Sequence, residues 1–273
     1  MCLYAYPRGA ILPQNLPPPP RLVRINLDEP ERTEEAEVAL PGPPRNRNAG
    51  PPDVSQVGPH KMFADPTGKH LVLCMRNGDN FYWTSGLKKA RLMPRWRGFV
   101  IESIAWHPEA AAAAGSARSG RAPGKVSSTR EILVGTRNGD IYEAVLTSPS
   151  ILDDEEGDFL DRLARRTAGA GSGGGDIDRI FRHIFSLSER QAISGLSVNH
   201  WTSQSGGHPS KAAIVATTST RIYEFVGILR KDRKEDSDSS SLYAPVFQPY
   251  RGSIPNLSKC LDDGNGFARP STF

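Results

Sequence analysis

Cysteine is scarce in this sequence, and long apolar runs are missing. The three cysteines, Cys2, Cys74 and Cys260, lie far apart and form neither a C-x-x-C pair nor a disulfide framework, which favours a reducing, cytoplasmic setting. No run of about 18 apolar residues is present, so we expect no membrane-spanning helix. The first residues also lack the continuous apolar core of a secretory leader, and none is expected.

A large excess of one charge is missing as well. The net charge is only +4, so composition does not require binding to DNA or RNA. Hydrophobic residues make up 37% of the chain beside 23 prolines and 26 glycines, which is low for a compact α/β enzyme. This balance is typical of a loop-rich β domain with disordered insertions.

Patterns that carry catalysis or metal binding are also missing. The six histidines are isolated, and neither a zinc-type H-E-x-x-H nor a G-x-S-x-G nucleophile elbow occurs. Residues 169–174 match the dinucleotide pattern G-x-G-x-x-G, but no strand precedes them and no capped helix follows, so they read as a linker. Residues 153–158 read as a solvated acidic loop. We predict no enzyme activity, no cofactor and no metal.

What the chain does contain is one hairpin pattern written three times, at residues 71–83, 132–144 and 213–225. Each copy has an apolar β-rich run, a short polar turn and a second run around a tyrosine, and the third aligns with the second without a gap. The first two turns are Asn-Gly pairs, in which both residues tolerate positive φ: Asn77, Gly78, Asn138 and Gly139. A further turn is predicted before the first copy, at Asp65, Pro66 and Gly68.

Flanking runs complete each hairpin into a four-stranded unit. Opening strands are predicted at 61–64, 99–106 and 193–198, and outer strands at 90–93 and 181–187. With the low-complexity insertions left out, the repeats recur about every 40 residues, the length of a WD-type β-propeller blade. The predicted fold is therefore all-β, an incomplete β-propeller with about three recognisable blades.

Composition predicts three regions along the chain. Residues 1–58 are proline-rich and mostly disordered, with one propeller strand near 21–27. Residues 59–230 form the partial propeller. Residues 231–273 form a polar, weakly ordered C-terminal segment.

One basic segment stands out beside Trp83 and Trp96. Its cations could contact an anionic surface, either lipid or RNA: Lys88, Lys89, Arg91, Arg95 and Arg97. The alternative is structural, because an outer blade strand is an edge strand and cations on an edge prevent unwanted pairing. The structural reading is the stronger of the two.

Several of these motifs resemble one family closely, the deep orange-type (Pep3-like) vacuolar protein sorting family. The matching segments occur in family order: Phe63–Leu71, Asn80–Tyr82, Lys89–Gly98, Val100–Trp106 and Thr129–Ala144. The four residues 24–27 also look like the end of the family's first blade. The resemblance is to the N-terminal propeller of the family.

The resemblance implies a non-enzymatic interaction module in a core class C subunit of the HOPS and CORVET tethering complexes. It implies docking to other class C subunits, with SNAREs and Rab GTPases reached through the complex and with no DNA partner. The expected place is cytoplasmic and peripheral, on late endosomes and the vacuole or lysosome, in vesicle docking and fusion. A generic WD-type scaffold with unrelated partners is the alternative.

The family's α-solenoid and RING zinc domain do not occur in this sequence, so it is interpreted as a fragment of such a subunit. An open set of blades leaves strand edges and apolar faces uncovered. We therefore predict that the isolated chain is marginally stable or prone to aggregate.

Overall fold

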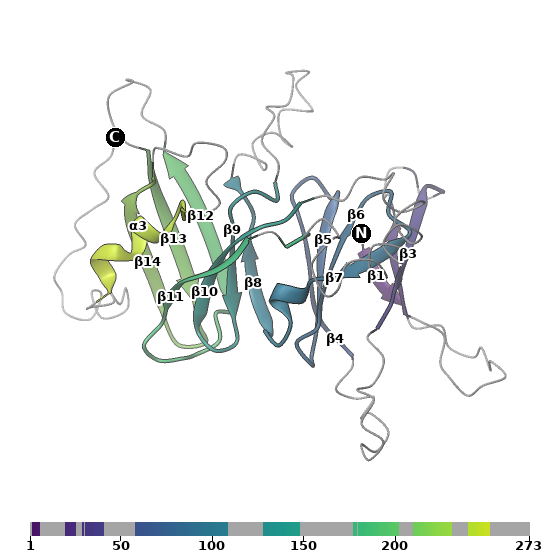
Figure 1. Cartoon of the computed structure of the whole chain (residues 1–273), viewed down its shortest axis with the longest axis horizontal. Coiled ribbons are helices and arrows are strands. Elements are labelled where there is room, and N and C mark those ends of the chain that lie inside the picture. Colours follow the sequence, from purple (N-terminus) through teal and green to yellow (C-terminus); the bar gives the residue numbers. More distant parts are fainter. Residues whose placement is uncertain are drawn as a thin grey trace, which may run out of the picture. The chain divides into compact units, whose positions relative to one another are not determined.

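The computed structural model describes residues 2–5, 20–25, 29, 31–40, 58–108, 128–147, 177–178, 180–201, 210–230 and 240–251. The glycine-rich and acidic stretches at 169–174 and 153–158 lie outside the described residues. The chain divides into two compact units, one formed by residues 1–100 and 147–179 and the other by 101–146 and 180–273 (Figure 1). In the described part of the chain no helix is long and apolar enough to cross a membrane.

The first unit contains a four-stranded antiparallel meander of the propeller-blade type. Its strands follow one another in chain order: β4 (Pro59–Ala64), β5 (His70–Met75), β6 (Asn80–Thr84) and β7 (Lys89–Leu92). Strand β6 and nearly all of β5 are buried on both faces, as expected for uninterrupted apolar runs. These strands confirm the first predicted blade.

A second group of strands continues this sheet beyond β7. Strands β1 (Cys2–Ala5), β2 (Arg21–Ile25) and β3 (Thr33–Val38) are antiparallel to one another, and β3 pairs with β7 in parallel. Because Glu37 lies opposite Lys89 in this pairing, β7 is an inner strand. The interpretation of its cations as protection of a free edge is therefore wrong: an acidic neighbouring strand, which the pattern of residues 1–58 did not reveal, covers that edge.

Packing fixes the β2–β3 hairpin to the blade. Its apolar side chains join the buried core of the first unit, whose members include Leu22, Val38, Trp83, Leu87 and Ala90. Burial of each large apolar side chain contributes about 1.5–3 kcal/mol, more than a solvent-exposed ion pair provides. Apolar burial is thus the main attachment of the hairpin.

The second unit contains two further blade-type sheets. One is a four-stranded antiparallel meander: β8 (Ile101–Ala105), β9 (Ile132–Thr136), β10 (Asp140–Val145) and β11 (Ile180–Ser186). The other has three antiparallel strands: β12 (Gly195–Trp201), β13 (Lys211–Thr217) and β14 (Ile222–Ile228). Side chains of both sheets share one core, which includes Leu133, Phe185, Ile214 and Phe225. The fold is therefore all-β, that of an incomplete β-propeller.

A short C-terminal segment covers the unpaired edge of β14, where the other two blades have a fourth strand. It contains helix α3 (Ala244–Phe247) and the 3₁₀ turn η3 (Gln248–Tyr250). The Tyr250 hydroxyl accepts a bond from the Val226 N–H (3.1 Å) and donates to the Val226 carbonyl (3.2 Å). The Tyr250 side chain thus pairs with the backbone N–H and carbonyl of Val226, which a fourth strand would otherwise pair with.

This segment is held by the carboxylate of Glu143, which is buried on β10. Glu143 accepts hydrogen bonds from the backbone N–H groups of Leu242 (3.1 Å) and Tyr243 (3.0 Å) and from the Ser241 hydroxyl. Charge-assisted bonds of this kind are the strong ones in a protein interior. The predicted division of the chain at residues 58 and 230 stays a prediction. The composition of residues 1–58 did not indicate β3, and in the C-terminal region only the short apolar stretch at 242–247 pointed to α3.

Candidate protein-interaction surface at the hairpin turns

The two Asn-Gly hairpins share a three-residue turn. In the first, Gly78 N–H bonds the Met75 carbonyl (3.1 Å) and Met75 N–H bonds the Asp79 carbonyl (2.9 Å). Gly78 has φ +84°, whereas Asn77 is not among the described residues with positive φ. Of the two residues that tolerate positive φ, only the glycine adopts it in this turn. The geometry is that of a type I turn followed by a glycine bulge, for which the glycine alone needs the left-handed region.

The third hairpin differs by one residue in register. In the second hairpin Ile141 pairs with Gly135. The aligned residue of the third hairpin, Ile222, pairs with Thr217 rather than with Ala216, the residue that aligns with Gly135. The third turn has no glycine, so the left-handed bulge is unavailable to it. Two residues, Ser219 and Thr220, lie between the bonded pair of the third turn, Thr218 N–H and the Arg221 carbonyl (2.9 Å), against three between Met75 and Asp79 in the first. The gapless sequence alignment therefore does not carry over to strand pairing.

Each Asn-Gly turn presses against the chain that leaves its blade. In the first unit, a Cβ on Gly78 would lie 2.9 Å from the carbonyl carbon of Gly98, and Gly98 N–H bonds the Gly78 carbonyl (2.9 Å). In the second unit, a Cβ on Gly139 would lie 3.0 Å from the Cα of Arg190. Glycine is needed at both turns for the close approach as well as for the positive φ.

The residue after each of these glycines makes an ion pair with the same departing segment. Asp79 accepts from Arg97 Nε (3.1 Å), and Asp140 accepts from an Arg190 terminal nitrogen (3.0 Å). In both pairs the acid is largely buried while the guanidinium is exposed: 9% against 60% for the first, and 14% against 66% for the second. The repeated Asn-Gly-Asp therefore specifies a turn and an ion pair together.

Two more ion pairs of this form lie at the turn end of the second unit. Arg137, in the β9–β10 turn, donates from Nε to Glu102 (2.9 Å), and Arg221, in the β13–β14 turn, pairs with Glu189. The third hairpin thus has an arginine where the second has Asp140, and the departing segment supplies the acid instead. Arg137, Arg190 and Arg221 are named the turn-end arginines below.

The predicted basic segment does not form a single patch. Arg91 pairs across from Tyr82, which places Lys88 and Lys89 at the end of β7 remote from the hairpin turn. Arg95 and Arg97 follow β7 at the turn end. Their loop is held by the buried amide of Asn80, which donates to the carbonyls of Gly78, Trp96 and Phe99 (2.7–3.0 Å).

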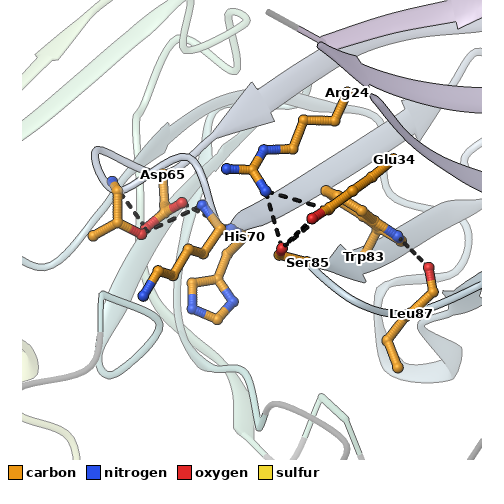
Figure 2. Close-up of polar contacts among 9 residues, drawn as sticks. Arg24, Glu34, Asp65, His70, Trp83, Ser85 and Leu87 are labelled. Atoms are coloured by element: carbon orange, nitrogen blue, oxygen red, sulfur yellow. Dashed lines mark hydrogen bonds and ion pairs between the residues drawn. The ribbon is translucent and has the colours of Figure 1, made fainter. Parts of the chain in front are cut away.

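The Asp65–Gly68 turn is stabilised by its own first side chain. The Asp65 carboxylate accepts from the Thr67 backbone (3.2 Å) and from the backbone N–H of His70 (2.8 Å), while Gly68 takes φ +67° (Figure 2). Burial lowers the pKa of the His70 imidazole, partly offset by the nearby Asp65 carboxylate. The role of this turn is to connect β4 and β5.

Polar contacts also attach the β2–β3 hairpin to the turn after β6. Figure 2 shows Arg24 donating to Ser85 (2.9 Å) and to Glu34 (3.2 Å), with Ser85 donating to Glu34 (2.9 Å). These side chains are only partly buried, so their contribution is small beside apolar burial. They define where the hairpin docks, whereas apolar burial provides most of its stability.

A histidine pair lies at the opposite end of the second unit. The rings of His107 and His200 meet edge to face at 5.1 Å, and His200 Nε2 is 3.0 Å from the Tyr243 hydroxyl. Burial lowers the pKa of His107, and the charge of Arg130 lowers it further. Among the described residues, no group of three or more His, Cys, Asp or Glu is arranged to hold a metal ion.

Comparison with known proteins agrees with this architecture. The Pep3/Vps18/deep orange beta-propeller domain matches residues 19–271. The chain is 29% identical over 261 residues to a Danio rerio vacuolar protein sorting-associated protein 18 homolog, covering 92% of this chain and 22% of that protein. It is 23% identical over 173 residues to an Arabidopsis thaliana vacuolar sorting protein 18, covering 62% of this chain and 13% of that protein.

The chain thus spans about a fifth or less of the length of these relatives. The domain match covers nearly all of the described residues, and the resemblance drawn from the hairpin and turn motifs is confirmed. The chain belongs to the Pep3/Vps18/deep orange β-propeller family.

Proposed function

We propose that this chain is a non-enzymatic protein-interaction module of an endosomal and vacuolar membrane-tethering complex of the HOPS and CORVET class. Family membership over residues 19–271 carries the proposal, and it favours this role over that of a WD-type scaffold with unrelated partners. The proposed partners are other class C vacuolar sorting subunits, with SNAREs and Rab GTPases engaged through the complex. Association with late endosomes and the vacuole or lysosome is then peripheral, through those partners.

The blade ends support a binding role. Loops held at the ends of a rigid sheet are the usual place for recognition in β-propellers. Here the turns are held by ion pairs and by close backbone contacts, so their side chains are presented in a fixed arrangement. Preorganised surfaces lose less conformational entropy on binding, which favours their use as docking sites.

Co-purification tests this function directly. The tagged chain is co-expressed with the other class C subunits, and the captured material is analysed by quantitative mass spectrometry. We expect subunits in near-stoichiometric amount, and equal capture by the control Lys211→Gln, which alters an exposed cation remote from the turns. A folded chain, verified by circular dichroism, that captures none of these subunits would contradict the proposal.

We retain binding to anionic surfaces through Lys88, Lys89, Arg91, Arg95 and Arg97 as a second proposal. The exposure of four of these side chains supports it, although Glu37 and Asp79 lie beside two of them. Flotation with phosphatidylserine vesicles and binding to single-stranded RNA, at low and high salt, test it. Unchanged binding after charge reversal at Lys88, Lys89 and Arg91 would rule out this use of the segment.

A further inference from the structure

The turn end of the second unit carries three exposed guanidiniums on interlocked loops. Arg190 lies in the segment that Gly139 touches, its neighbour Glu189 pairs with Arg221, and the Thr220 hydroxyl donates to Gln191 (2.8 Å). Arg137 belongs to the same turn as Gly139. The turn-end arginines therefore project from one contiguous group of loops.

Each turn-end arginine is paired in the same arrangement, with the acid more buried and the guanidinium more exposed. The exposed fractions of the arginine and acid side chains are 50% and 9% at Arg137, 66% and 14% at Arg190, and 42% and 24% at Arg221. A guanidinium has five N–H donors in a planar fork. The ion pairs of Arg190 and Arg221 each join one terminal guanidinium nitrogen to the acid, while 66% and 42% of these two arginine side chains are exposed.

The charge balance of this group decides what it can attract. The three arginines and their three acids sum to zero, so the long-range attraction that draws polybasic segments to anionic membranes is weak here. What remains is short-range, directional donation from guanidinium forks, which suits carboxylates that approach to hydrogen-bond distance. The tips of these loops are polar, at Asn138, Gly139, Gln191, Ser219 and Thr220, and an exposed apolar side chain, Ile222 (45%), follows directly after Arg221.

We propose that the turn-end arginines form a docking surface for an acidic segment of a partner protein. Carboxylates of that segment bind the outer N–H groups of Arg137, Arg190 and Arg221, while Glu102, Asp140 and Glu189 hold the guanidiniums in place from below. This assignment deepens the proposed function, on which it rests for the identity of the partner as a fellow subunit. Because each arginine is paired with an acid beneath it, the surface favours partners whose carboxylates reach hydrogen-bond distance over partners that only carry a large negative net charge.

A fluorescent glutamate-rich peptide, with a glutamine-rich peptide of equal length as its counterpart, probes the surface by anisotropy on the full chain. The test variant combines Arg137→Gln, Arg190→Gln and Arg221→Gln, since glutamine still offers N–H donors to the acids beneath. Loss of three charge-assisted contacts predicts at least about tenfold weaker binding of the acidic peptide. A second variant, with lysine at all three positions, keeps the charge and removes the fork, and is expected to weaken binding about threefold or more.

The matched control removes three cations at the opposite end of the same unit: Arg130→Gln, Lys211→Gln and Arg230→Gln. We expect it to change affinity less than about twofold, because exposed charges at this distance are largely screened. Equal weakening by the control and test variants, or full binding by the lysine variant, would overturn the proposal in favour of nonspecific electrostatics. Binding to phosphatidylserine vesicles with the same arginine dependence, and none to the peptide, would overturn the choice of a protein partner.

Subunit capture separates this proposal from the proposed function. If the native chain captures class C subunits and the glutamine variant captures them equally, the docking surface is wrong and the function stands. If the native chain captures none but binds the acidic peptide through the turn-end arginines, the surface stands and the tethering function fails. Affinities are compared only between variants whose thermal unfolding midpoint lies within a few degrees of that of the native chain.

Discussion

The contact between the first hairpin turn and the segment after β7 can be tested with two glycines that differ only in their surroundings. Gly78 and Gly98 have nearly the same backbone conformation, φ +84° and +87°. A Cβ on Gly98 would meet nothing within 4 Å, whereas a Cβ on Gly78 would lie 2.9 Å from backbone carbon. Alanine in the left-handed region costs about 1–2 kcal/mol at either position. Overlap with backbone adds about 1–3 kcal/mol at Gly78 alone.

We therefore expect Gly78→Ala to lower the free energy of unfolding of the first unit by about 2–5 kcal/mol, and Gly98→Ala by about 1–2 kcal/mol. Urea unfolding followed by tryptophan fluorescence measures both, because Trp83 and Trp96 are buried in this unit. The m-value shows whether a variant changes stability or cooperativity. Equal loss of stability in the two variants would refute the close contact, since the backbone conformation alone would then account for both.

Three further predictions concern stability. Burial and Arg130 place the folded-state pKa of His107 below the unfolded value of about 6.5, so the unfolded chain binds the proton first. The free energy of unfolding should then fall as pH drops below about 6.5, and less steeply in His107→Gln; identical pH profiles would contradict this. Glu143→Ala should cost about 3 kcal/mol or more by urea titration, because it leaves the C-terminal segment without its acceptor, whereas the partly exposed Glu224→Ala should cost about 0.5 kcal/mol or less. Lys89→Glu should cost up to about 1 kcal/mol by placing like charges opposite each other, and adding Glu37→Lys should restore it; an additive double mutant would refute the pairing.

Local patterns predicted most of the blade strands. Alternation and β-branched runs around the turns at Gly78 and Gly139 set the hairpins, because strand pairs joined by a short turn are specified by a few adjacent residues. The same logic failed at the third hairpin, where the tyrosine motif aligned without a gap. Register depends on turn length, and the lack of a glycine near Thr220 was the signal that this turn differs in length from the other two.

Contacts between distant segments were not predictable in this way. The parallel pairing of β3 with β7 joins residues far apart in the chain, and the composition of 1–58 suggests disorder until that partner is present. Likewise, the short apolar recovery at 242–247 gave the only sign of α3, whose docking depends on Glu143 about a hundred residues earlier. The repeated Asn-Gly-Asp was a visible clue to the ion pairs of the turns, but the sequence did not reveal which arginines pair with these aspartates.

Binding at the turn end of the second unit, the docking surface proposed above, can be measured residue by residue. Hydrogen–deuterium exchange of the full chain, free and bound to the co-purified class C subunits, shows which turns the partner covers. We expect slowed exchange on binding at 137–140, 187–193 and 218–221, with little change at the opposite end near Arg130 and Arg230. Protection confined to that opposite end, with the three turns unchanged, would contradict it.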